Sequence, residues 1–90
     1  MLALDKKPIK NKKAVNRLIK DETIILGLES QIIYITNKTG SLIWKSINGK
    51  TTIAEIIEKI ADEFSVTRKQ AKRDVISFIN RLIKHGLIKA

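Results

Sequence analysis

The spacing of hydrophobic and polar positions along the chain changes near residue 37. Before this point, apolar and largely β-branched residues form short runs between polar breaks, which is typical of strands and turns. After it, apolar residues recur three and four positions apart, the spacing of amphipathic helices. The predicted strands cover residues 15–19, 23–28 and 31–36. The pattern therefore predicts an α+β fold, winged helix-turn-helix-like, with a three-stranded antiparallel sheet followed by three helices.

The predicted third strand is apolar on both faces, because Ile32, Ile33, Tyr34 and Ile35 follow one another. Such a strand needs cover on both sides. At the edge of a sheet, its unpaired backbone groups could accept an extended peptide as an added strand. The pairing register is not readable from a pattern that is apolar on both faces.

Small polar residues mark the starts of the three predicted helices, where their side chains can accept from free backbone N–H groups. The expected capping residues are Asn37 for the first helix, Thr52 with Glu55 for the second, and Thr67 with Gln70 for the third. Glycines mark two expected ends, since they tolerate the left-handed conformation that closes many helices. We expect the first helix to end at Asn48-Gly49 and the third just before Gly86.

The third helix is predicted to have an apolar core face and a mixed flank. At 100° per residue, one face carries Ala71, Val75, Phe78, Ile79 and Leu82. Lys72, Ile76 and Ile83 lie on a flank of this face. Leu87 and Ile88 are expected to fold back onto the core, as apolar residues after a glycine cap often do.

The composition fits one small intracellular domain. Ninety residues can form a single core, and the absence of cysteine excludes disulfides and thiolate metal sites. No apolar run approaches the roughly 20 residues that cross a bilayer. We therefore expect a cytoplasmic protein without a membrane partner.

The positive charge is concentrated at the two ends of the chain. The net charge is +9, and the excess of Lys and Arg lies in residues 1–20 and 67–90. Residues 1–14 contain Pro8, five lysines and little periodicity, which predicts a basic flexible N-terminal arm before a domain at 15–90. Basic charge of this kind suits nucleic acid, an anionic membrane surface or an acidic peptide.

The sequence offers no constellation for catalysis, a metal or a cofactor. It contains no Gly-rich phosphate loop and no nucleophile with a matching base, and its one histidine, His85, is expected at a helix end. Trp44 and Tyr34 are expected to pack rather than to stack on bases. We therefore predict a binding protein and not an enzyme.

Two binding surfaces remain open on pattern alone. One is a groove between the edge of the third strand and the third helix, with pockets floored by Ile76, Ile79 and Ile83 and with nearby basic residues for acidic side chains. The other is the third helix used as a DNA recognition helix, with Arg68, Lys69, Lys72 and Arg73 toward phosphates. That helix lacks a cluster of residues that read bases, so nucleic acid is the second choice. A third alternative is an accessory subunit that docks on an enzyme without touching substrate.

A string of short motifs runs through most of the chain in a fixed order. Its elements are Arg17, Asp21-Glu22, Tyr34, Asn37-x-Thr39-Gly40, Ile43-Trp44, Gly49-x-Thr51, Ile53-x-Glu55-Ile56-Ile57, Asp74-Val75 and Gly86-Leu87-Ile88. In this order and spacing the chain resembles the PqqD family, which includes the peptide chaperone of pyrroloquinoline quinone biosynthesis. Its members are also called RiPP precursor-peptide recognition elements.

The resemblance implies a non-catalytic peptide-binding chaperone of natural product biosynthesis. The leader segment of a ribosomally made precursor peptide would dock antiparallel to the third strand, against the third helix. The domain would present it to a modifying enzyme such as a radical SAM enzyme, a leader peptidase or a cyclase. On this chain the implied peptide-binding residues are Ile32, Ile33, Tyr34, Ile35 and Thr36 opposite Lys72, Arg73, Ile76, Ile79, Asn80 and Ile83. The basic third helix suggests an acidic partner, and a homodimer through the strand edge stays open.

Overall fold

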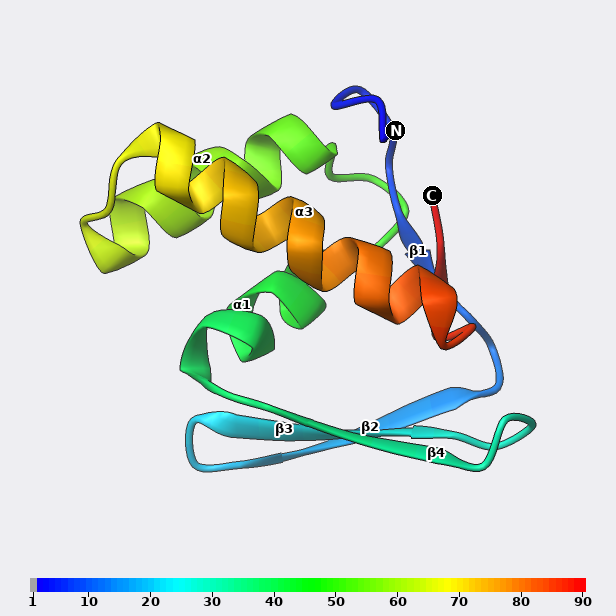
Figure 1. Cartoon of the computed structure of the whole chain (residues 1–90). Coiled ribbons are helices and arrows are strands. Elements are labelled where there is room, and N and C mark those ends of the chain that lie inside the picture. Colours follow the sequence, from blue (N-terminus) through cyan, green and yellow to red (C-terminus); the bar gives the residue numbers. More distant parts are fainter. Residues whose placement is uncertain (1) are drawn as a thin grey trace.

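The structure, a computed structural model, describes residues 2 to 90. A three-stranded sheet forms one layer, and three helices cover one of its faces (Figure 1). The strands are β1 (Ile9–Lys10), β2 (Ala14–Ile19), β3 (Glu22–Gly27), β4 (Ile32–Thr36) and β5 (Ile88–Lys89), and the helices are α1 (Lys38–Ser46), α2 (Ile53–Phe64) and α3 (Arg68–Lys84). This confirms the predicted fold class and adds a small two-strand sheet formed by β1 and β5.

The larger sheet has the strand order β2-β3-β4, and both pairings are antiparallel. The β2–β3 hairpin closes with two residues, Lys20 and Asp21, between the paired Ile19 and Glu22. Thr23 donates from Oγ1 to Ser41 Oγ over 2.8 Å, and Ser41 donates to the Asp21 carbonyl over 2.9 Å. These bonds attach the hairpin to α1.

Capping residues set the helix boundaries much as the sequence predicts. Asn37 Oδ1 accepts from Gly40 N over 2.9 Å, and Thr52 and Glu55 form the complete capping box. Thr67 accepts from Gln70 N, but within residues 2–90 no return bond from the Gln70 side chain is formed. The second predicted capping box is therefore only half formed, which fits an exposed site where water can satisfy the remaining N–H.

Two helix ends can be compared with their predicted positions. Gly86 has φ +71° just past α3, as predicted. α1 ends at Ser46, before the predicted Asn48-Gly49, because Ile47 turns into extended backbone with its side chain fully buried. Asn48 then accepts from the two N–H groups of Lys50 and Thr51, which stabilises a turn in place of a further helical residue.

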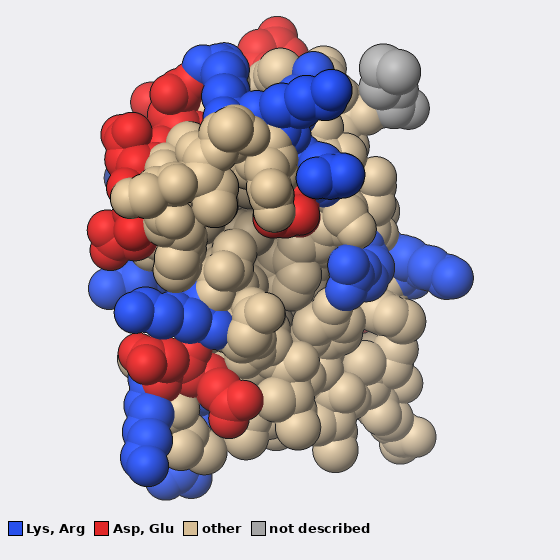
Figure 2. Space-filling model, turned by 60° about the vertical axis from the view of Figure 1, so that its left-hand side comes forward, with Lys and Arg blue, Asp and Glu red and all other residues tan. Residues whose placement is uncertain are grey.

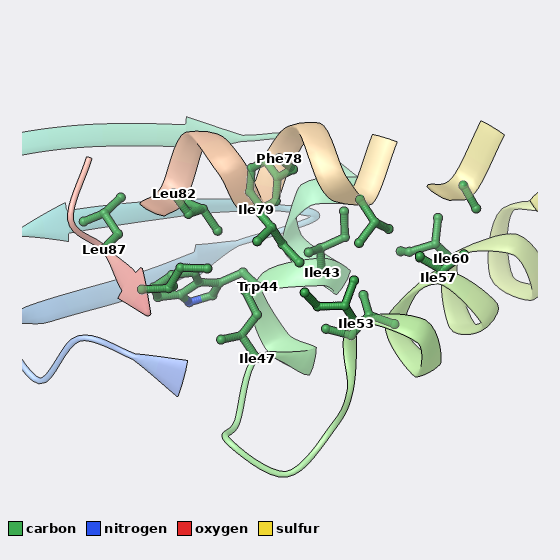
Figure 3. Close-up of a cluster of buried hydrophobic side chains, with 14 of the residues drawn as sticks. Ile43, Trp44, Ile47, Ile53, Ile57, Ile60, Phe78, Ile79, Leu82 and Leu87 are labelled. Atoms are coloured by element: carbon green, nitrogen blue, oxygen red, sulfur yellow. The ribbon is translucent and has the colours of Figure 1, made fainter. Parts of the chain in front are cut away.

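The core lies between the three helices and the inner face of the sheet (Figure 3). The fully or nearly fully buried apolar residues are Ile25, Ile43, Trp44, Ile47, Ile53, Ile56, Ile57, Ile60, Ala71, Val75, Phe78, Ile79, Leu82, Leu87 and Ile88. All five residues of the predicted α3 core face are among them, and so are Leu87 and Ile88. The helical periodicity thus identified the core face of α3 correctly.

The segment expected to be a flexible arm makes specific contacts in the structure. Ile9 and Lys10 pair with Lys89 and Ile88, and Pro8 is buried. The carbonyls of Leu4 and Lys6 accept from the N–H groups of Ala54 and Ile53, at the start of α2. These N–H groups have no partner inside their own helix, so the segment satisfies donors that the helix leaves free. The domain boundary at residue 15 stays a prediction.

Gly40, in the first turn of α1, allows a close approach of α1, β4 and α3. A Cβ atom at this position would overlap Thr36 and would lie 3.2 Å from Phe78 Cε1. Gly40 itself is buried. The glycine of the Asn37-x-Thr39-Gly40 motif therefore sets how closely the end of β4 lies to α3.

Among residues 2–90, no helix is long and apolar enough to span a membrane.

Candidate functional site

The edge strand β4 is the first part of the candidate site, because it pairs with β3 on one side only. Its side chains alternate: Tyr34 and Thr36 face the helices, whereas Ile33 and Ile35 are 69% and 63% exposed on the outer face. Figure 2 shows a broad area without charged side chains in its lower right part, at the height of the sheet in Figure 1.

The backbone groups that point outward from β4 can be assigned from the hydrogen bonds of β3. Leu28, just after β3, donates its N–H to the carbonyl of Lys13 over 2.8 Å, so even-numbered residues of β3 direct their backbone toward β2. Odd-numbered residues face β4, where their partners are Ile32, Tyr34 and Thr36. Ile33 and Ile35 therefore direct their N–H and C=O groups outward, free to pair with an added strand.

A groove of about 370 Å³ lies between β4 and α3. We call it the β4–α3 groove. Its lining residues are Tyr34, Ile35, Thr36, Asn37, Thr39, Gly40, Ile43, Asp74, Ser77, Phe78 and Arg81. The floor is apolar, since Ile43 and Phe78 belong to the core. An extended peptide on β4 would place alternate side chains over this floor.

Tyr34 connects the two walls of the groove. Its ring meets that of Phe78 edge to face, with centroids 5.8 Å apart, and lies 6.0 Å from the ring of His85. Arg81 donates from Nη1 to the Tyr34 hydroxyl over 3.3 Å and from Nη2 to Ser77 Oγ over 3.1 Å. The strand and the helix are thus held at a defined separation by one aromatic pair and one arginine.

The groove carries one charge of each sign, at different places along α3. Asp74 and Arg81 are seven residues apart, which corresponds to about 10 Å along a helix. Arg81 lies beside Tyr34, and Asp74 lies one turn before Phe78, toward the Thr36 and Gly40 end. The charges that line the groove therefore sum to zero, but the negative charge and the positive charge lie at different positions along it.

The strand residues predicted for the site, Ile32, Ile33, Tyr34, Ile35 and Thr36, all form the edge strand. The predicted α3 residues, Lys72, Arg73, Ile76, Ile79, Asn80 and Ile83, do not line the groove. Ile79 is fully buried in the core. Ile83 is partly buried and packs against the core. Peptide contact by these residues stays a prediction, and the structure gives them no place in the β4–α3 groove.

The difference arises because α3 has two flanks beside its core face. Ile76 lies about 160° around the helix from Asp74, and Ile83 lies about 160° from Arg81. Helical periodicity defines the core face but not which flank docks beside β4. Periodicity therefore does not identify Ser77, Phe78 and Arg81 as groove residues. Asp74 belongs to the motif string, but the string gives it no role.

Neither the groove nor its surroundings offers a site for a metal ion. Among residues 2–90, no three or more His, Cys, Asp or Glu side chains are grouped so that they could hold one. An apolar floor, a free strand edge and two separated charges are the features of a site that binds an extended polypeptide segment.

Fold and site together define a small α+β domain with a groove beside the edge strand of its sheet. The family model described as "Coenzyme PQQ synthesis protein D (PqqD)" matches residues 22–88, most of the chain. The protein belongs to the PqqD family. No match was found among curated protein sequences.

Two solved structures share this fold along almost their whole length. The first is TbiB1 in complex with the TbiA(beta) leader peptide: TM-score 0.84, 27% identity, with 91% of this chain and 95% of TbiB1 covered. The second is a lasso peptide synthetase B1 complexed with the leader peptide, with a TM-score of 0.82 and 18% identity. The match covers 93% of this chain and 99% of the synthetase chain. At 18% identity the second comparison shows a shared fold only.

Proposed function

We propose that this protein is a non-catalytic recognition element that binds the leader segment of a ribosomally made precursor peptide and presents it to a modifying enzyme. The leader segment adds to β4 as a fourth strand in the sheet, antiparallel to β4. The outward backbone groups of Ile33 and Ile35 supply hydrogen bonds, and the floor of the β4–α3 groove takes alternate apolar side chains. Tyr34, Phe78 and Arg81 contact these side chains directly.

The observation that carries the proposal is the free β4 edge beside a groove with the core residues Ile43 and Phe78 at its floor, in a chain of the PqqD family. The two solved structures of the same fold contain leader peptides, and one of them shares 27% of its residues with this chain. The groove does not resemble a DNA-reading surface, since its one cationic side chain, Arg81, bonds to Tyr34 and Ser77.

Strand addition is tested by replacing Ile35 with proline. This change removes an outward N–H from an exposed edge position and leaves the β3–β4 bonds of Tyr34 and Thr36 in place. We expect affinity for a leader peptide, taken from a precursor encoded near this chain's own gene, to fall at least about tenfold. Isothermal calorimetry measures the affinity, and circular dichroism checks the fold.

The matched control is Ile35→Ala, which shortens the side chain but keeps the N–H. It should lose far less affinity than Ile35→Pro. Amide NMR titrations with the leader peptide and with a short DNA duplex complete the test. Equal affinities of the proline and alanine variants would rule out strand addition, and shifts on adding DNA centred on residues 68–73 would point to nucleic acid instead.

A further inference from the structure

The second edge of the sheet also borders a hollow. Among residues 2–90 no strand pairs with the outer side of β2, and a hollow of about 400 Å³ lies between β2, α1 and the end of α2. Its apolar lining comes from Leu18, Leu42, Trp44 and Phe64, and Leu18 is 63% exposed. We call it the β2 pocket. Because β2 and β4 are opposite edges of the sheet, this pocket is separate from the β4–α3 groove.

The backbone of β2 can accept a strand next to this pocket. Even-numbered residues of β3 bond to β2, so their partners Val15, Arg17 and Ile19 use their backbone groups inside the sheet. Asn16 and Leu18 consequently direct their N–H and C=O groups outward. Both side chains also line the β2 pocket. A segment added along β2 would therefore lie directly beside the hollow.

The charged residues around the β2 pocket are mostly lysines. Lys10, Lys20, Lys38 and Lys45 line it, against two acids, Asp21 and Glu63. The β4–α3 groove, by contrast, has one charge of each sign. An acidic segment would therefore gain more from the β2 pocket than from the groove.

Two residues that line the pocket, Lys10 and Trp44, have side-chain donors without an acceptor among residues 2–90. Trp44 is 2% exposed, and its indole N–H has no partner among residues 2–90. Lys10 Nζ lies 4.8 Å from the centroid of the Trp44 ring, and partial burial lowers the pKa of Lys10. Within the same residues Lys10 forms no ion pair. A carboxylate entering beside Lys10 would restore the partner that its partly buried ammonium lacks.

We propose that the β2 pocket is a second binding site, which takes an extended segment of a partner protein whose apolar and acidic residues are two positions apart, so that they share the strand face turned toward the pocket. The apolar side chains pack on Leu18, Leu42 and Phe64. The acidic side chains meet the surrounding lysines, with one beside Lys10 and Trp44. Because the two sites use opposite edges of the sheet, the partner and a peptide in the β4–α3 groove can bind at the same time.

The test uses the capped peptide Glu-Thr-Leu-Thr-Glu-Thr-Leu, which carries Glu and Leu on one strand face, as the probe and NMR as the readout. Trp44 is the only tryptophan in the sequence, so its indole N–H gives a single reporter signal. On adding the probe, we expect saturable shifts of this signal and of the amides of Asn16 and Leu18. The shifts should weaken as salt is raised, because the attraction is partly electrostatic.

Leu18→Glu is the disrupting variant and Leu28→Glu its matched control. Both place a carboxylate at an exposed leucine, at 63% and 59% exposure, but only Leu18 lines the pocket. We expect Leu18→Glu to weaken binding of the probe at least about tenfold, through lost apolar contact and added repulsion. Leu28→Glu should bind the probe as the unmodified chain does.

Four outcomes would overturn the proposal. The probe could leave the Trp44 indole signal unmoved, or it could shift only the amides of Ile33 and Ile35, which would place it in the β4–α3 groove. The matched peptide with Lys in place of Glu could bind equally well, which would remove the acidic preference. Finally, Leu18→Glu and Leu28→Glu could weaken binding to the same extent.

Discussion

Single polar residues decide where this chain changes from strand to helix. Asn37 turns β4 into α1 by accepting one backbone N–H, and Thr52 and Glu55 each accept from the other's backbone at the start of α2. These effects depend on residues within four positions of each other, so they are readable from the sequence.

The bonds between Thr52 and Glu55 also affect the ionisation of Glu55. The backbone N–H of Thr52, followed by its hydroxyl, holds the pKa of the Glu55 carboxyl below its ordinary value.

This lowered pKa gives a pH-dependent contribution to stability. A carboxyl whose pKa is lower in the folded state stabilises the fold above its unfolded pKa, and the contribution is lost as pH falls through the folded pKa. We expect the unmodified chain to be more stable than Glu55→Gln at neutral pH. The gap should narrow as pH falls from about 4.3, the ordinary glutamate value, through the lowered one. Urea unfolding of both chains at pH 7 and pH 3 measures it, and a gap of constant size would contradict the assignment.

At the scale of elements, the fold followed from the sequence and part of the site did not. Periodicity located three strands, three helices and the core face of α3, because burial against a neighbour repeats at the period of the element. It did not tell which flank of α3 lies beside β4. That choice depends on how Tyr34 packs on Phe78 and on how closely Gly40 lets α1 approach them. The outward backbone groups of β4 were equally unreadable, since they follow from its pairing with β3.

The position of Arg81 in the β4–α3 groove predicts a charge preference along the bound peptide. A peptide antiparallel to β4 passes Asp74 first and Arg81 afterwards, so basic residues are favoured early and acidic residues late in the docking segment. Arg81→Glu should weaken binding of a peptide that has an acidic residue in its later half. Because Arg81 is a charge at the rim of the groove, we expect the affinity for this peptide to fall about threefold to tenfold. Calorimetry at two salt concentrations measures it.

Arg73→Glu is the matched control for Arg81→Glu, because it makes the same change of charge on the same helix outside the groove. Arg73 is also one of the residues that the sequence predicts for the site. We expect it to leave affinity nearly unchanged. A larger loss for Arg73→Glu than for Arg81→Glu would move the peptide to the other flank of α3.

At the scale of the whole molecule, the first residues of the chain complete the fold. Leu2 and Leu4 pack against the core, and Ile9 and Lys10 pair with the end of the chain. From its sequence this segment is expected to be an arm, because its apolar residues follow no helix or strand period. Its contacts are instead backbone bonds to α2 and scattered apolar insertions, which leave no periodic signal.

Deletion of residues 2–10 tests this role of the segment. It exposes part of the core and leaves the N–H groups of Ile53 and Ala54 without their present acceptors. We expect the free energy of unfolding to fall by at least about 2 kcal/mol, measured by urea unfolding. The control is the double variant Lys6→Ala with Lys7→Ala, which keeps the backbone bonds and should change stability little. An equal stability of the deleted and complete chains would show that the segment is dispensable.

The pairing of β1 with β5 also places the two ends of the fold side by side. Figure 1 shows these strands together, at a distance from the outer edge of β4. A second protein tethered to either end would thus start from the same place and leave the β4–α3 groove open. With a short flexible linker, a tethered enzyme would meet the captured peptide at an effective concentration of the order of millimolar. A fusion at either end would therefore leave the proposed peptide site accessible.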